Sequence, residues 1–451
     1  MISYLFSGYK IFLHFSVPKH EFWLRIYVLL VLSVFLSNIT IAQDKIFGNY
    51  FEFNFNYNIK DTIPLQAIVD AADEGDTIVL LPGIYSGPIT ITQNSIIIDG
   101  QGKAEINGRG IASVVTVNGE AVVLRNLQLS NSGGSHNNID AGVKLVGSHN
   151  TIDNCRIKEC LFGIDISQSD SNFIYHNDIS SLSRREMALK GDAIRLWWAK
   201  GNKVQGNYWH GVRDMVVWYS EGNSFIENMG KGNRYGIHFM YSHHNYIRGN
   251  ELYNNSVGVF LMYSEKTIMI NNLIQGCTGV SGMCLGMKET SSNQILNNTF
   301  LYSTEGIHFD VAPFVPEKRN TIQGNEIAFC GSGMFFHTNQ IGNDITNNIF
   351  HDNLSNVTAE GKTASGNYWN GNYFDEYQGF DMDGDNVGDT PFDLYNYVEH
   401  LWDYNDDVKF FYGSPLLVIF DFLERLAPFS EPKFVLRDEA PVYILEKKDK
   451  K

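Results

Sequence analysis

The chain has 451 residues, of which 43% are hydrophobic and 19% are charged, and its formal net charge is −16. This length supplies enough apolar material for a large continuous core in one elongated domain. The acidic balance argues against a nucleic-acid partner, because phosphate contacts require a clustered basic surface. Acidity suits a protein that gathers cations, although the plainer interpretation is that the charge keeps the protein soluble.

Residues 1–42 have the features of an export signal, and residues 43–64 form a poorly patterned lead-in. Basic residues precede an apolar run of 11 residues at 26–36, and a small-residue cleavage site follows at Ala42. A membrane span needs about 20 apolar residues. The short run therefore favours cleavage and export to the periplasm, while an uncleaved anchor is the alternative.

A short amphipathic helix is expected at the start of the regular part of the chain. Leu65, Ile68, Val69 and Ala72 have helical apolar spacing, and short strands separated by turns follow. The open end of a stack of strands exposes apolar core and unpaired strand edges. This helix is therefore expected to cap such an end.

Short phrases of alternating residues recur along the middle of the chain. They read GDAIRLWWA from Gly191, DMVVWYS from Asp214, GIHFMYS from Gly236, GVFLMYS from Gly258, GMCLGMKE from Gly282, GIHFDVA from Gly306 and GMFFHTN from Gly333. Alternation with period two is typical of a strand that buries one face. In the third phrase, Ile237 and Phe239 are expected to face inward, while His238 and Met240 face outward.

A second pattern, Asn-x-(Ile/Val)-x-x-Asn, lies between the phrases. Its leading asparagines include Asn202, Asn223 and Asn245, which are 21 and 22 residues apart. We expect asparagine and glycine at corners because they adopt left-handed backbone angles easily. A repeat of this length with several short strands predicts a stacked β-solenoid. The predicted fold is all-β, a right-handed parallel β-helix over 65–370, since the frame of a leucine-rich repeat is missing.

The outward positions of the phrases align into two columns of side chains. The first column is Arg195, Val216, His238, Phe260, Cys284, His308 and Phe335, and the second is Trp197, Trp218, Met240, Met262, Gly286 with Met287 beside it, Asp310 and His337. Thioether, thiolate and imidazole are the ligands that Cu(I) prefers. The Cu(I) candidates are therefore His238, Met240, Met262, Cys284, Met287 and His308.

Methionine and tryptophan are also favoured in protein contacts, so the same stripe fits a docking surface that includes Trp197 and Trp218. The two interpretations are compatible, because a carrier must dock in order to hand over its ion. A sugar-acting enzyme is a further alternative, since many β-helices process polysaccharides. Its candidate residues are Asp165, Asp192, Arg195, Lys288, Glu289 and Asp310. They are spread over many coils, without the tight carboxylate pair that such chemistry needs.

Five cysteines cannot all pair internally because their number is odd. Cys155 and Cys160 are expected in the core as small apolar residues, although a bridge between neighbouring coils is the alternative. Cys284 differs, since its place in the phrase predicts an outward side chain.

An acidic loop marks a C-terminal cap at 371–412. Asp381, Asp383, Asp385 and Asp389 lie at nearly alternate positions with glycines between them. Such carboxylates can surround a structural Ca²⁺. A plain acidic turn is the alternative, because the glycines do not follow the pattern of an EF-hand.

The segment 413–451 contains an amphipathic helix and a lysine-rich tail. Ser414 and Pro415 suit a helix start, and an apolar stripe that includes Leu416, Leu417, Phe420 and Leu423 follows. This helix is too short to span a membrane. It is expected to close the solenoid, to dock onto a membrane protein or to lie at the bilayer surface.

These phrases together resemble one known family. CLFGIDISQS from Cys160, GDAIRLWWAKGN from Gly191, RDMVVWYS from Arg213, RYGIHFMYS from Arg234, NSVGVFLMYS from Asn255, GMKE from Gly286, the FDMDGDNVGDTP loop and the tail GSPLLVIFDFLERLAPFSEP are similar to the NosD family, over about residues 60–443. NosD proteins are periplasmic maturation proteins of nitrous oxide reductase.

The resemblance implies a right-handed β-helix that works with an ABC-type permease and its ATPase. Copper would arrive from a lipoprotein chaperone and serve the copper site of the reductase, and the chain itself would not be an enzyme. Met240, Met262 and Met287 fall within matching phrases and are the best candidate ligands by resemblance. The C-terminal helix is the implied permease contact, and no P-loop occurs in the chain.

Overall fold

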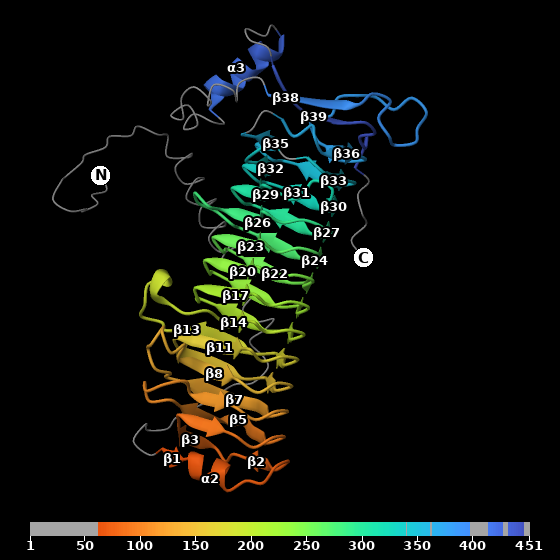
Figure 1. The fold of residues 1–451 in the computed structure, drawn as a ribbon. Helices are drawn as coiled ribbons and strands as arrows, with labels where there is room; N and C mark the ends of the chain where they lie inside the picture. The colour runs from red at the N-terminus through yellow and green to blue at the C-terminus, as the bar shows by residue number, and fades with distance from the viewer. Residues whose placement is uncertain (1–61, 340, 361–362, 397–413, 427–431, 446–451) are drawn as a thin grey trace, which may run out of the picture. The chain divides into compact units, whose positions relative to one another are not determined.

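The computed structural model describes residues 62–339, 341–360, 363–396, 414–426 and 432–445. Over these residues the chain is nearly all β and winds into a right-handed parallel β-helix (Figure 1), so the predicted fold class is confirmed. The predicted export signal lies outside the described residues. Among the helices within those ranges, none is long and apolar enough to cross a membrane.

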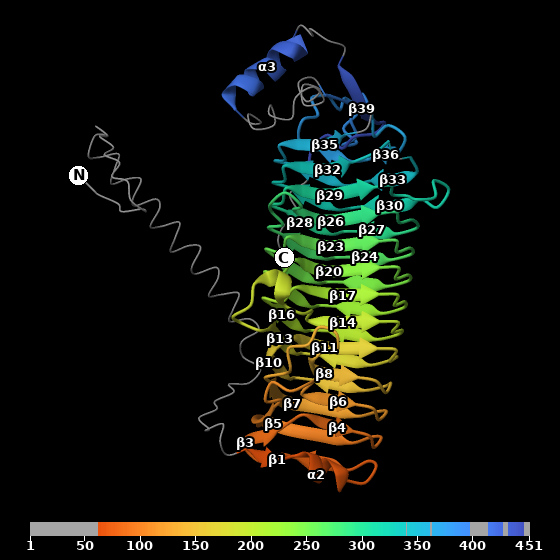
Figure 2. The same cartoon turned by 60° about the vertical axis from the view of Figure 1, so that its left-hand side comes forward.

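Each coil contributes one strand to a 12-stranded parallel sheet, which we call face 1. Its strands are β4 (Ile89–Ile91), β6 (Val115–Val117), β8 (Ala141–Leu145), β11 (Phe162–Ser167), β14 (Ile194–Trp197), β17 (Asp214–Trp218), β20 (Tyr235–Met240), β23 (Val257–Met262), β26 (Met283–Lys288), β29 (Glu305–Asp310), β32 (Ser332–Phe336) and β35 (Ser355–Ala359). Figure 2 shows these strands stacked one above another along the solenoid.

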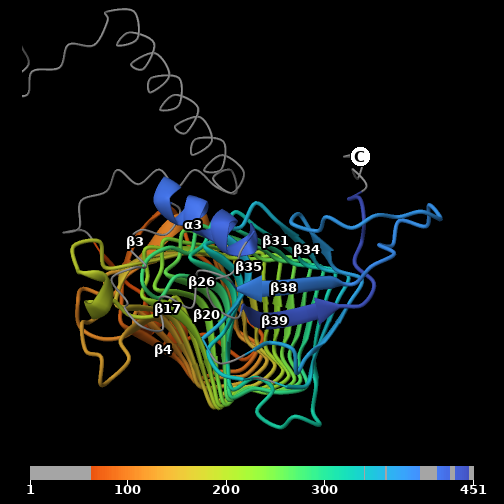
Figure 3. The same ribbon diagram turned by 90° about the horizontal axis from the view of Figure 1, so that it is seen from above.

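Shorter strands form the other two sides of each coil and belong to one 25-stranded sheet. Face 2 consists of β2 (Thr77–Val79), β5 (Ile97–Asn107), β7 (Val123–Ser130), β9 (Thr151–Asp153), β12 (Phe173–Tyr175), β15 (Lys203–Gln205), β18 (Ser224–Ile226), β21 (Tyr246–Arg248), β24 (Ile268–Ile270), β27 (Gln294–Leu296), β30 (Asn320–Gln323), β33 (Asn343–Thr346) and β36 (Tyr368–Asn370). Face 3 consists of β1 (Ile63–Pro64), β3 (Gly83–Ser86), the ends of β5 and β7, β10 (Arg156–Cys160), β13 (Asp178–Ser181), β16 (Tyr208–His210), β19 (Met229–Lys231), β22 (Glu251–Tyr253), β25 (Leu273–Gln275), β28 (Thr299–Leu301), β31 (Glu326–Ala328), β34 (Ile349–His351) and β37 (Tyr373–Phe374). Figure 3 looks along the stack and shows successive coils lying over one another.

The core runs through the inside of the stacked coils. Period-two alternation turns every second side chain inward, and the parallel register places like residues over one another. Phe309 stacks on Phe336 with 4.5 Å between ring centroids, and Phe350 stacks on Phe374 at 4.9 Å. Fully burying such a side chain contributes about 1.5–3 kcal/mol. A single coil has no partner for its inner side chains except its neighbours, so the coils stabilise one another.

Asparagines form two ladders inside the corners on either side of face 2. In the first ladder, Oδ1 of Asn223 accepts a hydrogen bond from the backbone N–H of Asn202 at 2.9 Å. In the second ladder, Asn250 accepts from the N–H of Asn228 at 3.0 Å, and both side chains are buried. The ladder asparagines themselves, such as Asn223, do not adopt left-handed backbone angles. Those angles fall mostly on the residue before a ladder asparagine, and glycine and asparagine do occupy such corner positions, as at Gly222 and Asn271.

The first coil is covered by α2 (Gln66–Asp70), which is shorter than the apolar pattern at 65–72 indicates. Leu65 and Val69 are fully buried beneath it. One further short turn, η1 (Met187–Leu189), lies in the long loop between β13 and β14.

The last strand of the coils is β37, and an antiparallel pair follows, β38 (Phe392–Asn396) with β39 (Lys433–Asp438). The Asp438 carboxylate accepts hydrogen bonds from Nδ2 of Asn372 at 2.7 Å and from its backbone N–H at 3.0 Å. Asp438 therefore takes the place of the next asparagine in the second ladder. The C-terminal helix α3 (Pro415–Leu426) begins at the proline that the sequence indicates.

Candidate functional site

Two columns of side chains run along the outward side of face 1. Strand register places Arg195, Val216, His238, Phe260, Gly286, His308 and Phe335 in the first column, and Trp197, Trp218, Met240, Met262, Lys288 and Asp310 in the second. Neighbours in a column are about 4.8 Å apart because they occupy adjacent strands. These columns agree with the columns predicted from the repeated phrases as far as Met262. In the next coil the observed residues differ from the predicted ones.

His238 on β20 is buried beneath a group of aromatic rings. Only 8% of its surface is exposed, and neither ring nitrogen has a hydrogen-bond partner among the described residues. The Tyr235 ring stacks on the imidazole at 4.7 Å, and the Trp218 ring meets it edge-on at 5.8 Å. Burial lowers the pKa of His238 to about 4. The imidazole is therefore neutral near pH 7 and keeps a free lone pair that can bind a metal.

Met240 and Met262 lie next to His238 on the same side of face 1. They are register partners on β20 and β23, and both side chains are half-buried. Met240 is two residues beyond His238 on its own strand, so the two side chains share one face. Two thioethers and one neutral imidazole are thus brought together by only two adjacent strands.

Aromatic side chains border these donors. Trp197 and Trp218 are register partners with ring centroids 5.7 Å apart, and the guanidinium of Arg195 lies 4.7 Å over the Trp197 ring. At the adjoining corner, Trp198 and Tyr219 stack at 4.9 Å with nearly parallel rings. This half-exposed aromatic area has the composition of a protein contact surface.

The expectation that Cys284 and Met287 face outward is wrong, because both side chains are completely buried in the core. Strand register pairs Phe260 with Gly286 and not with Cys284. The predicted columns are shifted by two residues in this coil, because the prediction takes Gly282 as the start of its phrase. The Cys284 Sγ atom lies 2.8 Å from Ser303 Oγ, and burial raises the pKa of its thiol.

The end of each phrase carries the signal that would have given the right register. The hydroxyl-bearing residues Ser220, Ser242 and Ser264 form a ladder, and Thr290 continues it by bonding to the Ser264 carbonyl. Met262 lies two residues before Ser264, and Lys288 lies two residues before Thr290. The ladder therefore aligns Met262 with Lys288. Sequence reasoning also missed Tyr235, because it precedes the glycine taken as the start of its phrase.

His308 faces outward as predicted but lies apart from the other candidate ligands. It is three strands from His238 along the first column, which corresponds to roughly 14 Å. Its Nδ1 atom is 2.7 Å from Oε2 of Glu305, and its ring stacks on Phe335. His308 therefore cannot share one ion with His238 in this arrangement.

The residues considered for sugar chemistry are engaged in ion pairs on separate coils. Asp165 pairs with Arg195 at 2.8 Å, and Asp192 pairs with Arg213 at 2.9 Å. Burial raises the pKa of Asp192 to about 7, in spite of the nearby arginine. Lys288 pairs with Asp310 beside Met262, while Glu289 lies at the corner with a left-handed backbone angle. Each of the three carboxylates in these pairs thus faces a cation. Asp192 also lies near the Asp214 carboxylate, but Arg213 pairs with both of them.

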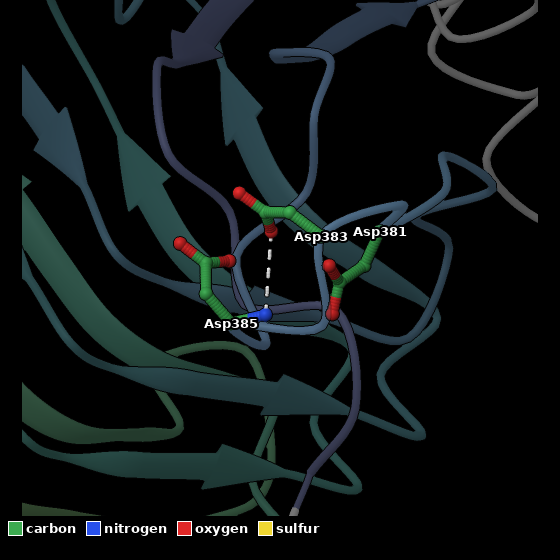
Figure 4. A group of neighbouring side chains, drawn as sticks. All are labelled: Asp381, Asp383 and Asp385. Carbon is green, nitrogen blue, oxygen red and sulfur yellow. Dashed lines mark hydrogen bonds between the residues drawn. The ribbon is translucent and has the colours of Figure 1, made fainter.

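The acidic loop brings three carboxylates together (Figure 4). Asp381, Asp383 and Asp385 each place one oxygen within 4.8 Å of the others. The backbone N–H of Asp385 lowers the pKa of Asp383, but the charges of Asp385 and Asp389 outweigh it and leave that pKa raised. Asp389 lies outside the group of three and accepts a hydrogen bond from the backbone N–H of Met382 at 2.6 Å.

Helix α3 exposes the apolar residues that the sequence assigns to a partner. Leu416, Phe420 and Leu423 are 61%, 44% and 44% exposed. The side chain of Leu417 lies outside the described part of the helix. Large exposed apolar side chains in one short helix are typical of a contact site.

These coils define a right-handed parallel β-helix protein, and the outer side of one sheet carries its candidate metal ligands. Residues 180–379 match the model of a family described as periplasmic copper-binding protein (NosD), and residues 112–229 match the model of the right handed beta helix region. Residues 180–379 are thus similar to the NosD family, and the resemblance seen in the phrases is confirmed. The match contains both outward columns and supports a periplasmic, copper-related role.

Several solved structures share the fold. The mannuronan C-5 epimerase A-module of Azotobacter vinelandii has a TM-score of 0.54 and 16% identity, covering 67% of this chain and 93% of that chain. A PL6 alginate lyase in complex with a trisaccharide has a TM-score of 0.51 and 15% identity, covering 72% and 84%. The pre-mature gene product 12 of bacteriophage phi29 has a TM-score of 0.54 and 13% identity, covering 75% and 54%. These similarities show the fold alone, and no curated protein matches the sequence.

Proposed function

We propose that this chain is a non-catalytic accessory protein that holds Cu(I) briefly on face 1 and passes it toward the copper site of nitrous oxide reductase. The main support is His238, which is 8% exposed and whose ring nitrogens both lack a hydrogen-bond partner among the residues that the structure describes. Leaving such a group unpaired costs about 1–3 kcal/mol, and a bound ion would offset that cost. The thioethers of Met240 and Met262 lie on the same face, within the segment that matches the copper-binding family.

The donor set suits a soft ion that must be released again. Thioether and imidazole prefer Cu(I), whereas Mg²⁺ or Ca²⁺ would require oxygen ligands. Cys284 is buried in the core, so no thiolate joins His238, Met240 and Met262. Three neutral donors without a thiolate give a modest affinity. An ion held in this way can exchange one ligand at a time with a partner that docks on face 1.

The partners in this proposal are an ABC-type permease with its ATPase, a copper chaperone lipoprotein and nitrous oxide reductase. The exposed apolar side of α3 is assigned to the permease, which keeps the chain at the inner membrane. The aromatic area around Trp197 and Trp218 is assigned to the protein that gives or receives copper. Hydrolysis of ATP takes place on the partner, because the chain has no P-loop.

An anaerobic Cu(I) titration of residues 43–451 against a chromophoric chelator tests the copper site. We expect one ion per chain and at least a tenfold weaker affinity in the Met240→Ala, Met262→Ala double variant, because loss of two ligands removes several kcal/mol. Met382→Ala is the matched control, since Met382 is an exposed methionine in the acidic loop. Its affinity is expected to equal that of the unmodified chain.

The outcomes separate a carrier from a scaffold. No saturable binding would overturn the carrier proposal and leave face 1 as a metal-free docking surface. Binding that persists unchanged in the double variant would place the ion elsewhere. A sugar-acting enzyme has weaker support, because Asp165, Asp192 and Asp310 are all held in ion pairs. We expect neither lyase nor epimerase activity on polyuronates.

The permease assignment is tested by charge substitutions in α3. A truncation before Ser414 would also remove β39, which pairs with β38, so it would disturb the cap. Phe420→Glu with Leu423→Glu leaves β39 intact and is expected to abolish co-purification with the permease. Leu354→Glu, at an exposed apolar residue among the coils, is the control. Retained co-purification of the α3 variant would contradict the assignment.

We further propose that the acidic loop holds a structural Ca²⁺ through Asp381, Asp383 and Asp385. Carboxylate oxygens are the ligands that Ca²⁺ prefers, and the raised pKa of Asp383 reflects the repulsion that a cation would relieve. A calcium chelator is expected to lower the melting temperature of the unmodified chain but not of the Asp383→Asn, Asp385→Asn variant. Equal melting temperatures with and without the chelator would favour a plain acidic turn.

A further inference from the structure

One coil is longer than the coils directly before it, and two cysteines flank its extra residues. Asn228 to Asn250 and Asn250 to Asn272 are steps of 22 residues in the second ladder, whereas Asn272 to Asn298 is a step of 26. The second asparagine ladder continues through this coil without a break. The four extra residues therefore lie outside the ladder, in the loop between β25 and β26. Cys277 stands at the start of this loop, and Cys284 stands at its end.

The loop returns onto its own start. A Cβ on Gly282 would lie only 2.6 Å from the backbone oxygen of Cys277, so the two ends of the loop are in contact. Gly282 also donates its N–H to the Gly279 carbonyl at 3.0 Å. Val280 at the tip is fully exposed to solvent. The loop is therefore an exposed excursion with a narrow base.

The two thiols meet at this base, inside the core. The backbone N–H of Cys277 donates to Ser303 Oγ at 3.1 Å, and the same oxygen lies 2.8 Å from the Cys284 Sγ atom. Cys277 therefore lies beside the Cys284 thiol, because both residues contact the same Ser303 oxygen. Both side chains are completely buried.

The chemistry of this pocket favours an uncharged sulfur pair. Burial, and then the neighbouring Cys277 thiol, raises the pKa of Cys284. Metal binding requires thiolates that persist in the folded pocket, and this environment disfavours them. A disulfide needs a thiolate only while it forms, before the coil closes over the two residues, and afterwards it carries no charge and no unpaired donor. Cys155 and Cys160 lie elsewhere, since they contact the carbonyls of Leu124 and Leu129 in earlier coils. Cys330 is a neighbour of both thiols, but its Sγ atom contacts the carbonyls of Phe300 and Ala328.

We propose that Cys277 and Cys284 form a disulfide in the exported protein and close the base of the loop at 278–283. The two S–H bonds break, one S–S bond forms, and two protons and two electrons leave the chain. A protein disulfide of a thiol oxidase in the exporting compartment accepts the electrons and becomes a dithiol. Cys155, Cys160 and Cys330 remain thiols.

The disulfide would fix the register of β26, although the loop before this strand has four extra residues. Met283 pairs with Val257, and the correct pairing continues through Gly286 beneath Phe260. A slip in this coil would misplace the strand that adjoins Met262. The ring that the disulfide closes spans 277–284, and small rings of this kind restrict the unfolded chain.

The test is a mass-spectrometric thiol count on the full exported chain, denatured and alkylated without reductant. We expect three alkylated cysteines, and a peptide pair that joins Cys277 to Cys284 and separates after reduction. Five alkylated cysteines, or a bond that involves any other cysteine, would overturn the proposal. The measurement uses the unmodified protein, so it does not depend on the folding of a variant.

A second measurement uses variants and proteolysis. Cys277→Ser is expected to free Cys284 for alkylation on denaturation, and to make the Val280 loop a faster site of protease cleavage. Cys155→Ser is the matched control, since Cys155 is equally buried and far from the loop. A reducing agent should reproduce the cleavage pattern of Cys277→Ser in the unmodified chain. Unchanged cleavage on reduction would contradict a bond across the base of the loop.

Discussion

The corner ladders and the outer surface around His238 differ in whether their buried polar groups have hydrogen-bond partners. In the ladders every asparagine is satisfied, as for Asn228, which donates to Asn250 and to the Val204 carbonyl while accepting from Asn207. At the outer surface, the two nitrogens of His238 and the Nε1 atom of Trp218 have no partner in the described part of the chain. Satisfied polar groups stabilise a fold, whereas unsatisfied ones are retained where another property is needed.

The largest effect is expected from breaking a ladder in the middle. Asn228→Leu leaves the N–H of Asn207 and the Val204 carbonyl without their partner. It also removes the Nδ2 donor to Oδ1 of Asn250, which keeps only the backbone N–H of residue 228. Each buried unpaired group costs about 1–3 kcal/mol, so we expect a loss of at least about 3 kcal/mol, measured by denaturant unfolding. Glu227→Gln, at the exposed neighbour, should change stability by less than about 0.5 kcal/mol. A small effect of Asn228→Leu would show that the ladder is not what stabilises the coils.

A smaller effect is expected where the second ladder ends. Asp438→Ala removes the acceptor of Asn372 and of the Gly371 N–H at the last coil. Loss of these charge-assisted hydrogen bonds should cost about 2 kcal/mol. It should also loosen the β38–β39 pair, which limited proteolysis would detect as earlier cleavage of the C-terminal extension. Cleavage at the unmodified rate would mean that β39 is held by other contacts.

The pH dependence of stability tests a buried carboxylate of face 1. Burial raises the pKa of Asp192 to about 7, above that of an exposed aspartate. The stability that Asp192 contributes is therefore present at low pH and is lost as pH rises through about 7. Between pH 5 and 7 we expect a loss on the order of 1 kcal/mol per pH unit, measured as a falling melting temperature. Asp192→Asn should flatten this slope, and an unchanged slope would assign it to other groups.

The smallest effect on stability is expected at His238. His238→Phe keeps a ring between Tyr235 and Trp218 and removes two buried unpaired nitrogens. Stability should be unchanged or higher by about 1 kcal/mol, in contrast with Asn228→Leu, while Cu(I) affinity falls in the chelator competition. A marked loss of stability would instead show that the imidazole is needed for packing.

Much of this arrangement follows from the sequence, because a β-helix repeats its pattern in every coil. Alternation and spacing were sufficient to place His238, Met240 and Met262 on one face. They failed at Cys284, since the four extra residues of that coil lie before the strand and shift its start. The burial of His238 was also missed, because it depends on Tyr235 and Trp218, whose ring positions are set by packing between coils.

The left-handed corner residues have a consequence for how such a chain evolves. Because each coil closes on the same backbone turn and the same ladder bonds, a duplicated or deleted segment of one whole coil leaves the joints on both sides compatible. An insertion of four residues, as in the loop after Cys277, must instead be accommodated outside the coil. A duplication of β20 and its turn would also copy one histidine and one methionine. The number of donor pairs on face 1 would therefore increase with the number of such coils.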